Sequence, residues 1–258
     1  MNLHPMIDDE SLFWEFLAMA AHLAAIEKIA DQNIRKWILA SHARDRLAKK
    51  DVAVNVGPYI TLARETGAGG SELAAKVAKQ LGWDVLDREI VDYLVEHYGT
   101  PRSFVELVDE KQFNWLGEIV TTWINRSSIG DSAYTHRLGQ LLLLAAHHGN
   151  VVIVGRGARF FLPPDRGLSV RVLAPLEFRI EQEMRRQGIN HKEARKWVVE
   201  SDRNREAYVK DHFHKSPTDP HLYDLVVNVQ KLTQDDAADL IVAAAQAWMK
   251  RSAIRVDA

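Results

Sequence analysis

The feature that most constrains this chain is a glycine-rich stretch that separates an apolar run from a helical pattern. Residues 59–63 are mostly apolar and predict a short buried strand, whereas residues 64–70 contain three glycines, which exclude regular structure. From Ser71 onward, apolar residues recur at helical spacing. The order strand, glycine loop, helix is typical of a phosphate-binding loop, because backbone N–H groups and the start of the helix point at one anion. The alternative is a glycine-rich turn that binds nothing.

The end of this loop departs from the Walker A pattern. That pattern closes with Gly-Lys-Ser/Thr, where the lysine reaches the outer phosphates and the hydroxyl binds magnesium. This chain has Gly69-Gly70-Ser71, so the hydroxyl is present and the lysine is missing. Arg64 and Lys76 are candidates for the missing charge. Arg64 is the better one, because Lys76 lies six residues beyond Gly70, nearly two helical turns away.

Composition excludes several classes of protein. The chain has 258 residues, 47% of them hydrophobic and 26% charged, which allows one α/β domain with an extension. A formal net charge of -2 argues against a nucleic-acid partner or a polybasic membrane anchor, and the absence of cysteine excludes disulfides and thiolate chemistry. The N-terminus lacks the basic start of a signal peptide, and the longest apolar run, residues 16–26, is too short to span a bilayer. We expect a cytoplasmic protein.

The first fifth of the chain reads as helical. No glycine or proline occurs between Pro5 and Gly57, and apolar residues keep helical spacing from residue 8 to residue 49. We predict two helices with a break near residues 31–33, forming an N-terminal helical extension over residues 1–50. Its expected role is packing, or contact with a second copy in a homodimer.

Strands and helices alternate in the rest of the chain. This alternation predicts an α/β fold with a parallel sheet that helices cover on both faces. The run at residues 151–154 is wholly apolar, as expected of a central strand buried on both sides. Further strands are predicted at 83–87, 168–174 and 225–229, and helices at 71–81, 88–98, 105–126 (helical or mixed), 134–148, 175–187, 191–210 and 234–251.

Arginines follow the predicted loop in three places. Arg156 stands at the carboxyl end of an apolar strand, where ligands of open α/β sheets bind, and suits a phosphate clamp; the alternative is a surface arginine that caps a helix. Asp202 and Arg205 share a face of a charged helix, and residues 156–215 hold 14 Lys+Arg against 9 Asp+Glu. Such a helix either closes over phosphates or is simply solvated. Asp87-Arg88 either contacts a nucleotide or begins a helix with Asp87 as its cap.

The histidines do not have the spacing of a metal site. His147 and His148 are neighbours on a predicted helix and point apart, and His212, His214 and His221 lie in or beside a proline-bearing loop. We interpret both groups as structural or solvated. No nucleophile–base triad is apparent in the sequence.

The ordered landmarks of this chain resemble the cytidylate kinase-like family of P-loop nucleoside monophosphate kinases. They are RETGAGGSE, LGWDVLDREIV, VVIVGRGARFFL, VRVLAPLEFRIEQEMRRQGI, DRNREAYV and YDLVVN, and they cover roughly residues 59–245. The resemblance implies a three-layer P-loop kinase fold with a central parallel sheet over residues 59–251. It also implies a monophosphate-binding segment at about 88–145 and a lid at about 185–215.

The same resemblance implies an activity and a set of site residues. The reaction is transfer of the γ-phosphoryl group of ATP, with Mg²⁺, to a nucleoside monophosphate, with CMP or dCMP favoured. The implied phosphate-binding residues are Gly67, Ala68, Gly69, Gly70 and Ser71, with Ser71 near the metal; the acceptor is held by Asp87, Arg88, Arg137, Arg156, Asp202 and Arg205; and catalytic roles fall to Arg156, Arg203 and Arg205.

Two departures from the family pattern leave other functions open. Gly70 replaces the loop lysine, which questions the catalytic rate. Val154 and Gly157 replace aspartates that flank the strand-end arginine in cytidylate kinases, which questions the preference for cytosine. The alternatives are a catalytically weak or inactive nucleotide-binding regulator, and a kinase for another small acceptor.

Overall fold

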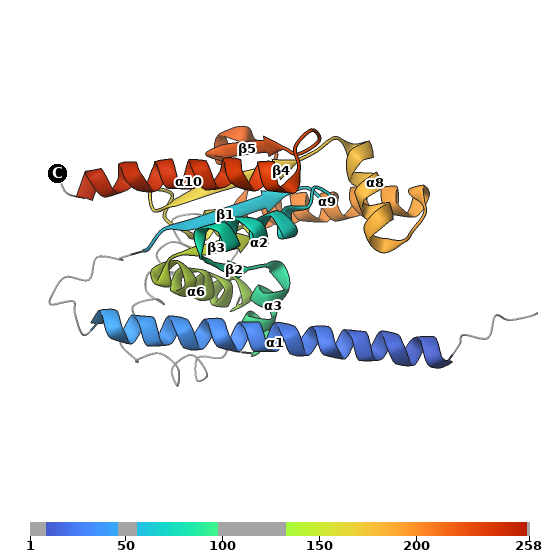
Figure 1. The fold of residues 1–258 in the computed structure, drawn as a ribbon, viewed down its shortest axis with the longest axis horizontal. Helices are drawn as coiled ribbons and strands as arrows, with labels where there is room; N and C mark the ends of the chain where they lie inside the picture. Colours follow the sequence, from blue (N-terminus) through green and yellow to red (C-terminus); the bar gives the residue numbers. More distant parts are fainter. Residues whose placement is uncertain (1–8, 46–55, 98–132, 257–258) are drawn as a thin grey trace, which may run out of the picture.

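A five-stranded parallel sheet organises the computed structural model, which describes residues 9–45, 56–97 and 133–256 (Figure 1). The sheet order is β2-β3-β1-β4-β5, and Leu62 pairs with Val154 on one side and Val170 on the other. All carboxyl ends therefore lie at one edge, and the glycine loop follows the central strand there. The strands are β1 (Tyr59–Arg64), β2 (Asp84–Leu86), β3 (Val151–Val154), β4 (Gly167–Leu173) and β5 (Leu225–Asn228).

Helices cover both faces of this sheet, which confirms the predicted three-layer architecture (Figure 1). Alternate side chains of β1 point to opposite faces: Ile60 and Leu62 pack with α2 (Gly70–Leu81) and α10 (Gln234–Val256), and Tyr59 packs on the other side. That other face is covered by α3 (Arg88–His97) and α6 (Ala133–His148). The remaining elements are α7 (Ala158–Phe161), α8 (Leu176–Gln187), α9 (His191–Phe213) and a 3₁₀ helix, η1 (Pro220–Leu222).

The N-terminal segment is one helix, α1 (Asp9–Asp45), so the predicted break near residues 31–33 is wrong. Ala30, Asn33 and Trp37 recur at helical spacing and are buried, and the helix packs against α3 and α6. Packing therefore favours a continuous helix through residues 31–33, although these three polar residues suggested a helix break in the sequence. Lys36 Nζ also lies 2.7 Å from Asp84 Oδ1 at the start of β2.

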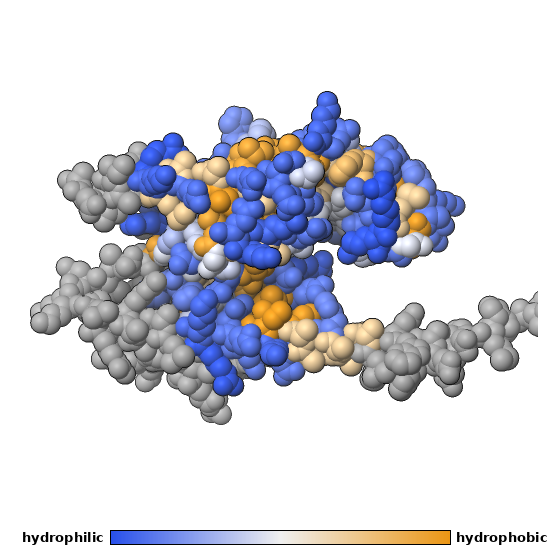
Figure 2. Space-filling view, in the orientation of Figure 1, coloured by the Kyte–Doolittle hydropathy of each residue, from blue (hydrophilic) through white to orange (hydrophobic). Residues whose placement is uncertain are grey.

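Apolar side chains of α1 are also exposed, and two of them, Met19 and Leu23, continue the helical stripe of Ala30 and Trp37 toward the N-terminal end of the helix. Met19, Leu23 and Ile29 are 65%, 55% and 44% exposed. Figure 2 shows an apolar area on the face in view, around α3 and the neighbouring part of α1. The homodimer contact stays a prediction. None of the helices in the described part of the chain is long and apolar enough to cross a membrane.

Most element boundaries lie within three residues of those predicted from the sequence. The strand at residues 151–154 is buried as predicted: β3 lies inside the sheet between β2 and β1, and all four of its residues are buried. The short helix α7 was not expected, and α10 runs further than predicted. The helix predicted at 105–126 and the loop at 127–131 lie outside the described residues.

We expect Trp37→Ala to lower the free energy of unfolding by about 3–5 kcal/mol, because loss of a fully buried indole would leave a cavity between α1 and the helices it packs against. Denaturant titration followed by circular dichroism measures this. Met19→Ala, at an exposed position of the same helix, should change stability by no more than about 0.5 kcal/mol. Equal effects of the two substitutions would contradict the docking of α1.

Candidate functional site

A cleft of about 1130 Å³ opens at the carboxyl edge of the sheet. Its walls include the glycine loop, the turn after β3, and side chains of α8 and α9. Arg156 and Arg205 both line it, although they come from distant parts of the sequence. The cleft therefore unites the strand-end arginine, the charged helix and the glycine loop.

The glycine loop is shaped for contact through its backbone. Gly67 and Gly69 have φ angles of 80° and 71°, a left-handed conformation that glycine adopts without strain. A Cβ at Gly67 would lie 2.4 Å from the carbonyl oxygen of Arg179, so the loop packs directly on α8. No side chain caps the start of α2. The first N–H groups of that helix are therefore available to an anion, and Ser71 is exposed beside them.

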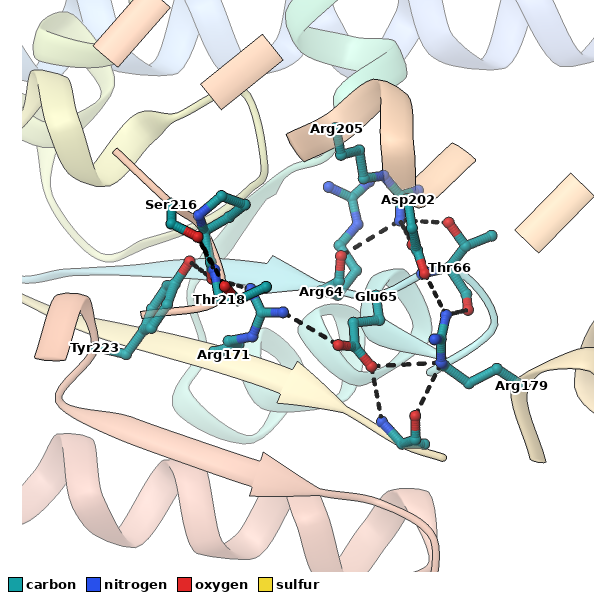
Figure 3. Close-up of polar contacts among 12 residues, drawn as sticks. Arg64, Glu65, Thr66, Arg171, Arg179, Asp202, Arg205, Ser216, Thr218 and Tyr223 are labelled. Carbon is teal, nitrogen blue, oxygen red and sulfur yellow. Dashed lines mark hydrogen bonds and ion pairs between the residues drawn. The ribbon is translucent and has the colours of Figure 1, made fainter. Parts of the chain in front are cut away.

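Helix α9 is anchored to this loop through Thr66 (Figure 3). The backbone N–H of Thr66 donates to Asp202 Oδ1 at 2.8 Å. Arg205 Nη1 donates to Thr66 Oγ1 at 2.8 Å and to the carbonyl oxygen of Arg64 at 3.3 Å. The predicted lid thus lies against the loop, held by the two residues that the sequence pattern singled out.

Behind the loop lies a buried network of charges that sequence reasoning missed. Arg179 donates to the carbonyl oxygens of Ala174 and Thr66 at 2.9 and 3.0 Å and pairs with Asp202. Glu65 lies between two arginines, 3.1 Å from Arg171 and 3.4 Å from Arg179 (Figure 3). These arginines have carboxylate partners, as buried charges require.

One of these missed residues carried a signal in the sequence. Arg171 stands between Val170 and Val172 in β4 and is 7% exposed in the structure. A charged residue in the middle of a strand that is buried on both faces needs a partner nearby. Arg179 gave no comparable signal, since an arginine in the first turn of a helix is ordinarily solvated.

Four further arginines line the cleft, and their positive charge is less fully balanced by carboxylates. Arg64, Arg88, Arg156 and Arg205 all line it. Asp92 is shared, since it pairs with Arg156 and lies 3.7 Å from Arg88. Burial, reinforced by Arg205, lowers the pKa of Arg64 to about 9, and burial also lowers the pKa of Arg205 against the pull of Asp202. Guanidinium groups stay protonated at neutral pH. The lowered pKa values therefore indicate positive charge that an anion would neutralise.

Three of the predicted site residues, and the alternative candidate Lys76, do not line the cleft. The Asp87 side chain accepts from the backbone N–H of Ile90 at 3.0 Å, so it caps α3, the alternative left open by the sequence. Arg203 is exposed on α9, and neither it nor Arg137 of α6 is among the described residues that line the cleft. Lys76 is paired with Asp235 at 2.6 Å, away from the cleft lining.

Two of the histidines singled out in the sequence make local contacts. His212 Nδ1 lies 2.9 Å from the carbonyl oxygen of Tyr208, and His221 Nδ1 lies 2.9 Å from Asp219 Oδ1. Among the described residues, no group of three histidines, aspartates or glutamates is arranged to hold a metal ion.

A parallel sheet with a glycine loop after its central strand and a basic helix over that loop defines a P-loop kinase fold. More narrowly, the chain belongs to the cytidylate kinase-like family, whose sequence model matches residues 59–231.

Individual relatives agree with this membership. The chain is 26% identical over 206 residues to a protein named cytidylate kinase from Methanopyrus kandleri, covering 76% of this chain and 97% of that one. It is 24% identical over 183 residues to a protein of the same name from Ignicoccus hospitalis, covering 70% and 95%. Among solved structures, an uncharacterized protein from Eubacterium ventriosum shares the fold, with a TM-score of 0.54, 19% identity, and coverage of 73% of this chain and 98% of that one.

We expect Asp202→Asn to loosen α9 from the loop, at a cost of about 1–3 kcal/mol, because Arg179 would lose a charged partner. Hydrogen exchange of the α9 backbone amides measures this local opening. Asp211→Asn, at an exposed position of the same helix, is the matched control and should leave the exchange rates unchanged. Unchanged exchange in Asp202→Asn would show that this contact does not hold the lid.

Proposed function

We propose that this protein is a nucleoside monophosphate kinase that transfers the γ-phosphoryl group of ATP to a nucleoside monophosphate. The observation that carries the proposal is convergence: the glycine loop and arginines from separate segments of the chain, among them Arg64, Arg88, Arg156 and Arg205, meet in one cleft. Phosphoryl transfer asks little covalent work of a protein, because positioning and neutralisation of charge lower the barrier. A cleft of this kind supplies both.

The residues present fit ATP. The backbone N–H groups of residues 67–71 would hold the phosphates, and uncompensated positive charge stands beside them. Ser71 is placed at the start of α2, where its hydroxyl would bind Mg²⁺. The metal, when bound, would supply positive charge that neutralises the charge developing on the phosphates. Arg205 would bring further charge from the lid.

The acceptor would lie on the α3 side of the cleft. Arg88 and Arg156 line that part, and Asp92 orients both. Their fork-shaped guanidinium groups suit a phosphate monoester. Asp87 and Arg137, which the resemblance also implied, would have to reorient to touch the acceptor.

The names of the relatives and the resemblance favour CMP or dCMP as the acceptor. Val154 and Gly157 stand where cytidylate kinases have the flanking aspartates, one of which contacts cytosine, and a Cβ at Gly157 would lie 2.3 Å from the ring of Phe213. Any side chain at residue 157 would displace that ring. Selection of the base would therefore rest on other residues.

The alternative function is a nucleotide-binding regulator with little or no turnover. Gly70 in place of the loop lysine favours it, as does α1, a long helix that packs on the acceptor side of the fold. Retention of Arg88 and Arg156 favours the kinase, because a sensor of ATP alone has no need of an acceptor clamp.

A panel assay separates the two. Purified protein with ATP and Mg²⁺ is offered CMP, dCMP, UMP, AMP and GMP, and ADP release is measured against the rate without acceptor. We expect release above background with CMP or dCMP. Background rates across the panel, together with measurable ATP binding by calorimetry, would favour the regulator.

We expect Arg205→Ala to lower kcat/KM by about 10²–10³-fold, because this guanidinium is aimed at the loop where phosphate charge would develop. Arg195→Ala on the same helix is the matched control: Arg195 is exposed and pairs with Glu177, so its loss should change kcat/KM less than twofold, within about the range of surface substitutions. Thermal melts establish that both variants fold. Equal rates would remove Arg205 from the reaction.

A further inference from the structure

The two departures of this loop from the Walker A pattern occur at related positions. The pattern G-x-x-x-x-G-K-[ST], aligned on Gly69, Gly70 and Ser71, puts its first glycine at residue 64 and its lysine at residue 70. This chain has arginine at the first of these positions and glycine at the second. The cation and the glycine have therefore changed places.

The structure brings these two positions into direct contact. A Cβ built on Gly70 would lie 2.6 Å from both Cβ and Cγ of Arg64 and 3.3 Å from Leu62. Real carbon atoms do not approach so closely, so the stem of Arg64 fills the space through which a side chain at residue 70 would leave the backbone. Only one of the two positions has room for a long side chain.

A second glycine receives the far end of the same arginine. Gly155 has a φ angle of 78°, and a Cβ there would lie 2.2 Å from Arg64 Nη1. The guanidinium therefore rests on the backbone of the β3 turn, next to Arg156 and within the cleft wall. Among the described residues, no carboxylate forms an ion pair with Arg64. Its charged neighbours Arg205, Arg88 and Arg156 repel it, and Asp87 alone opposes them.

We propose that Arg64, entering from the end of β1, does the work of the loop lysine and holds the outer phosphates of a nucleoside triphosphate. This inference rests on the proposed function and deepens it. Lys76 is not available for the role, because it is paired with Asp235. A guanidinium also offers two parallel N–H groups to phosphate oxygens, where an ammonium is a point charge.

The decisive experiment restores the standard order. The variants are Arg64→Gly, Gly70→Lys, and the double variant Arg64→Gly/Gly70→Lys, with Arg166→Ala, an exposed arginine outside the cleft lining, as the control. Binding of inorganic tripolyphosphate and of ATP with Mg²⁺ is measured by calorimetry, and thermal melts establish folding.

We expect Arg64→Gly to weaken tripolyphosphate binding by about 10–100-fold, because a charged donor is lost. Gly70→Lys should weaken it too, because the new side chain collides with Arg64. The double variant should recover to within about fivefold of the wild type, since the two substitutions act on one shared space. Arg166→Ala should bind as the wild type does.

A double variant that folds and binds no better than Arg64→Gly would overturn the inference. If Arg64→Gly does not fold, Arg64→Met keeps the stem and removes the charge; wild-type binding in that variant would also overturn the inference. Binding reports on Arg64 separately from turnover. Loss and recovery of tripolyphosphate binding without ADP release from any acceptor would support the role of Arg64 while contradicting the proposed kinase activity.

Discussion

Positive charge that the protein does not neutralise is the constraint on which the cleft depends. Two carboxylates, Glu65 and Asp202, are engaged with Arg171 and Arg179 behind the loop. The arginines on the cleft side have fewer carboxylate partners, and they repel one another. Each member comes from a different segment: Arg64 from the end of β1, Arg88 from α3, Arg156 from the turn after β3 and Arg205 from α9. Uncompensated charge of this kind costs stability, and an anion that entered the cleft would offset that cost, which is the exchange of stability for function expected at a binding site.

Thr66 connects the glycine loop to the charged residues of α8 and α9. Its N–H group donates to Asp202, its carbonyl oxygen accepts from Arg179, and its hydroxyl accepts from Arg205. One residue of the loop therefore contacts both α8 and α9. The conformation of the loop and the position of α9 are linked through these three bonds, so a change in one alters the other. The closing basic helix that the charge count suggested is in this way part of the loop's own support.

Hydrophobic periodicity and the positions of glycine and proline predicted the layers of sheet and helices, because the strands and helices here are rich in apolar residues and end near glycine or proline. The predictions failed where long-range packing decides. Residues 31–33 look like a helix break, yet buried Trp37 and Ala30 hold the helix together from both sides. Asp87 was ambiguous between cap and ligand contact, and only geometry showed the cap. Arg203 and Arg205 are both arginines of α9 and differ only in the side of the helix on which they lie. Which side faces the loop depends on how that helix packs.

The glycine loop shows why a motif is weaker than the physical requirement behind it. A pattern search asks for lysine at one position, whereas phosphate binding asks for a cation at one place in space. Arg64 and Gly70 each break the pattern, and the contact between them shows that neither change could be made alone without a clash or an empty volume. Gly155 extends the same logic, because the guanidinium occupies the space above its backbone. Considered separately, Arg64, Gly70 and Gly155 suggest a phosphate-binding loop that has lost its function. Considered together, they are consistent with a loop whose positive charge comes from the end of β1.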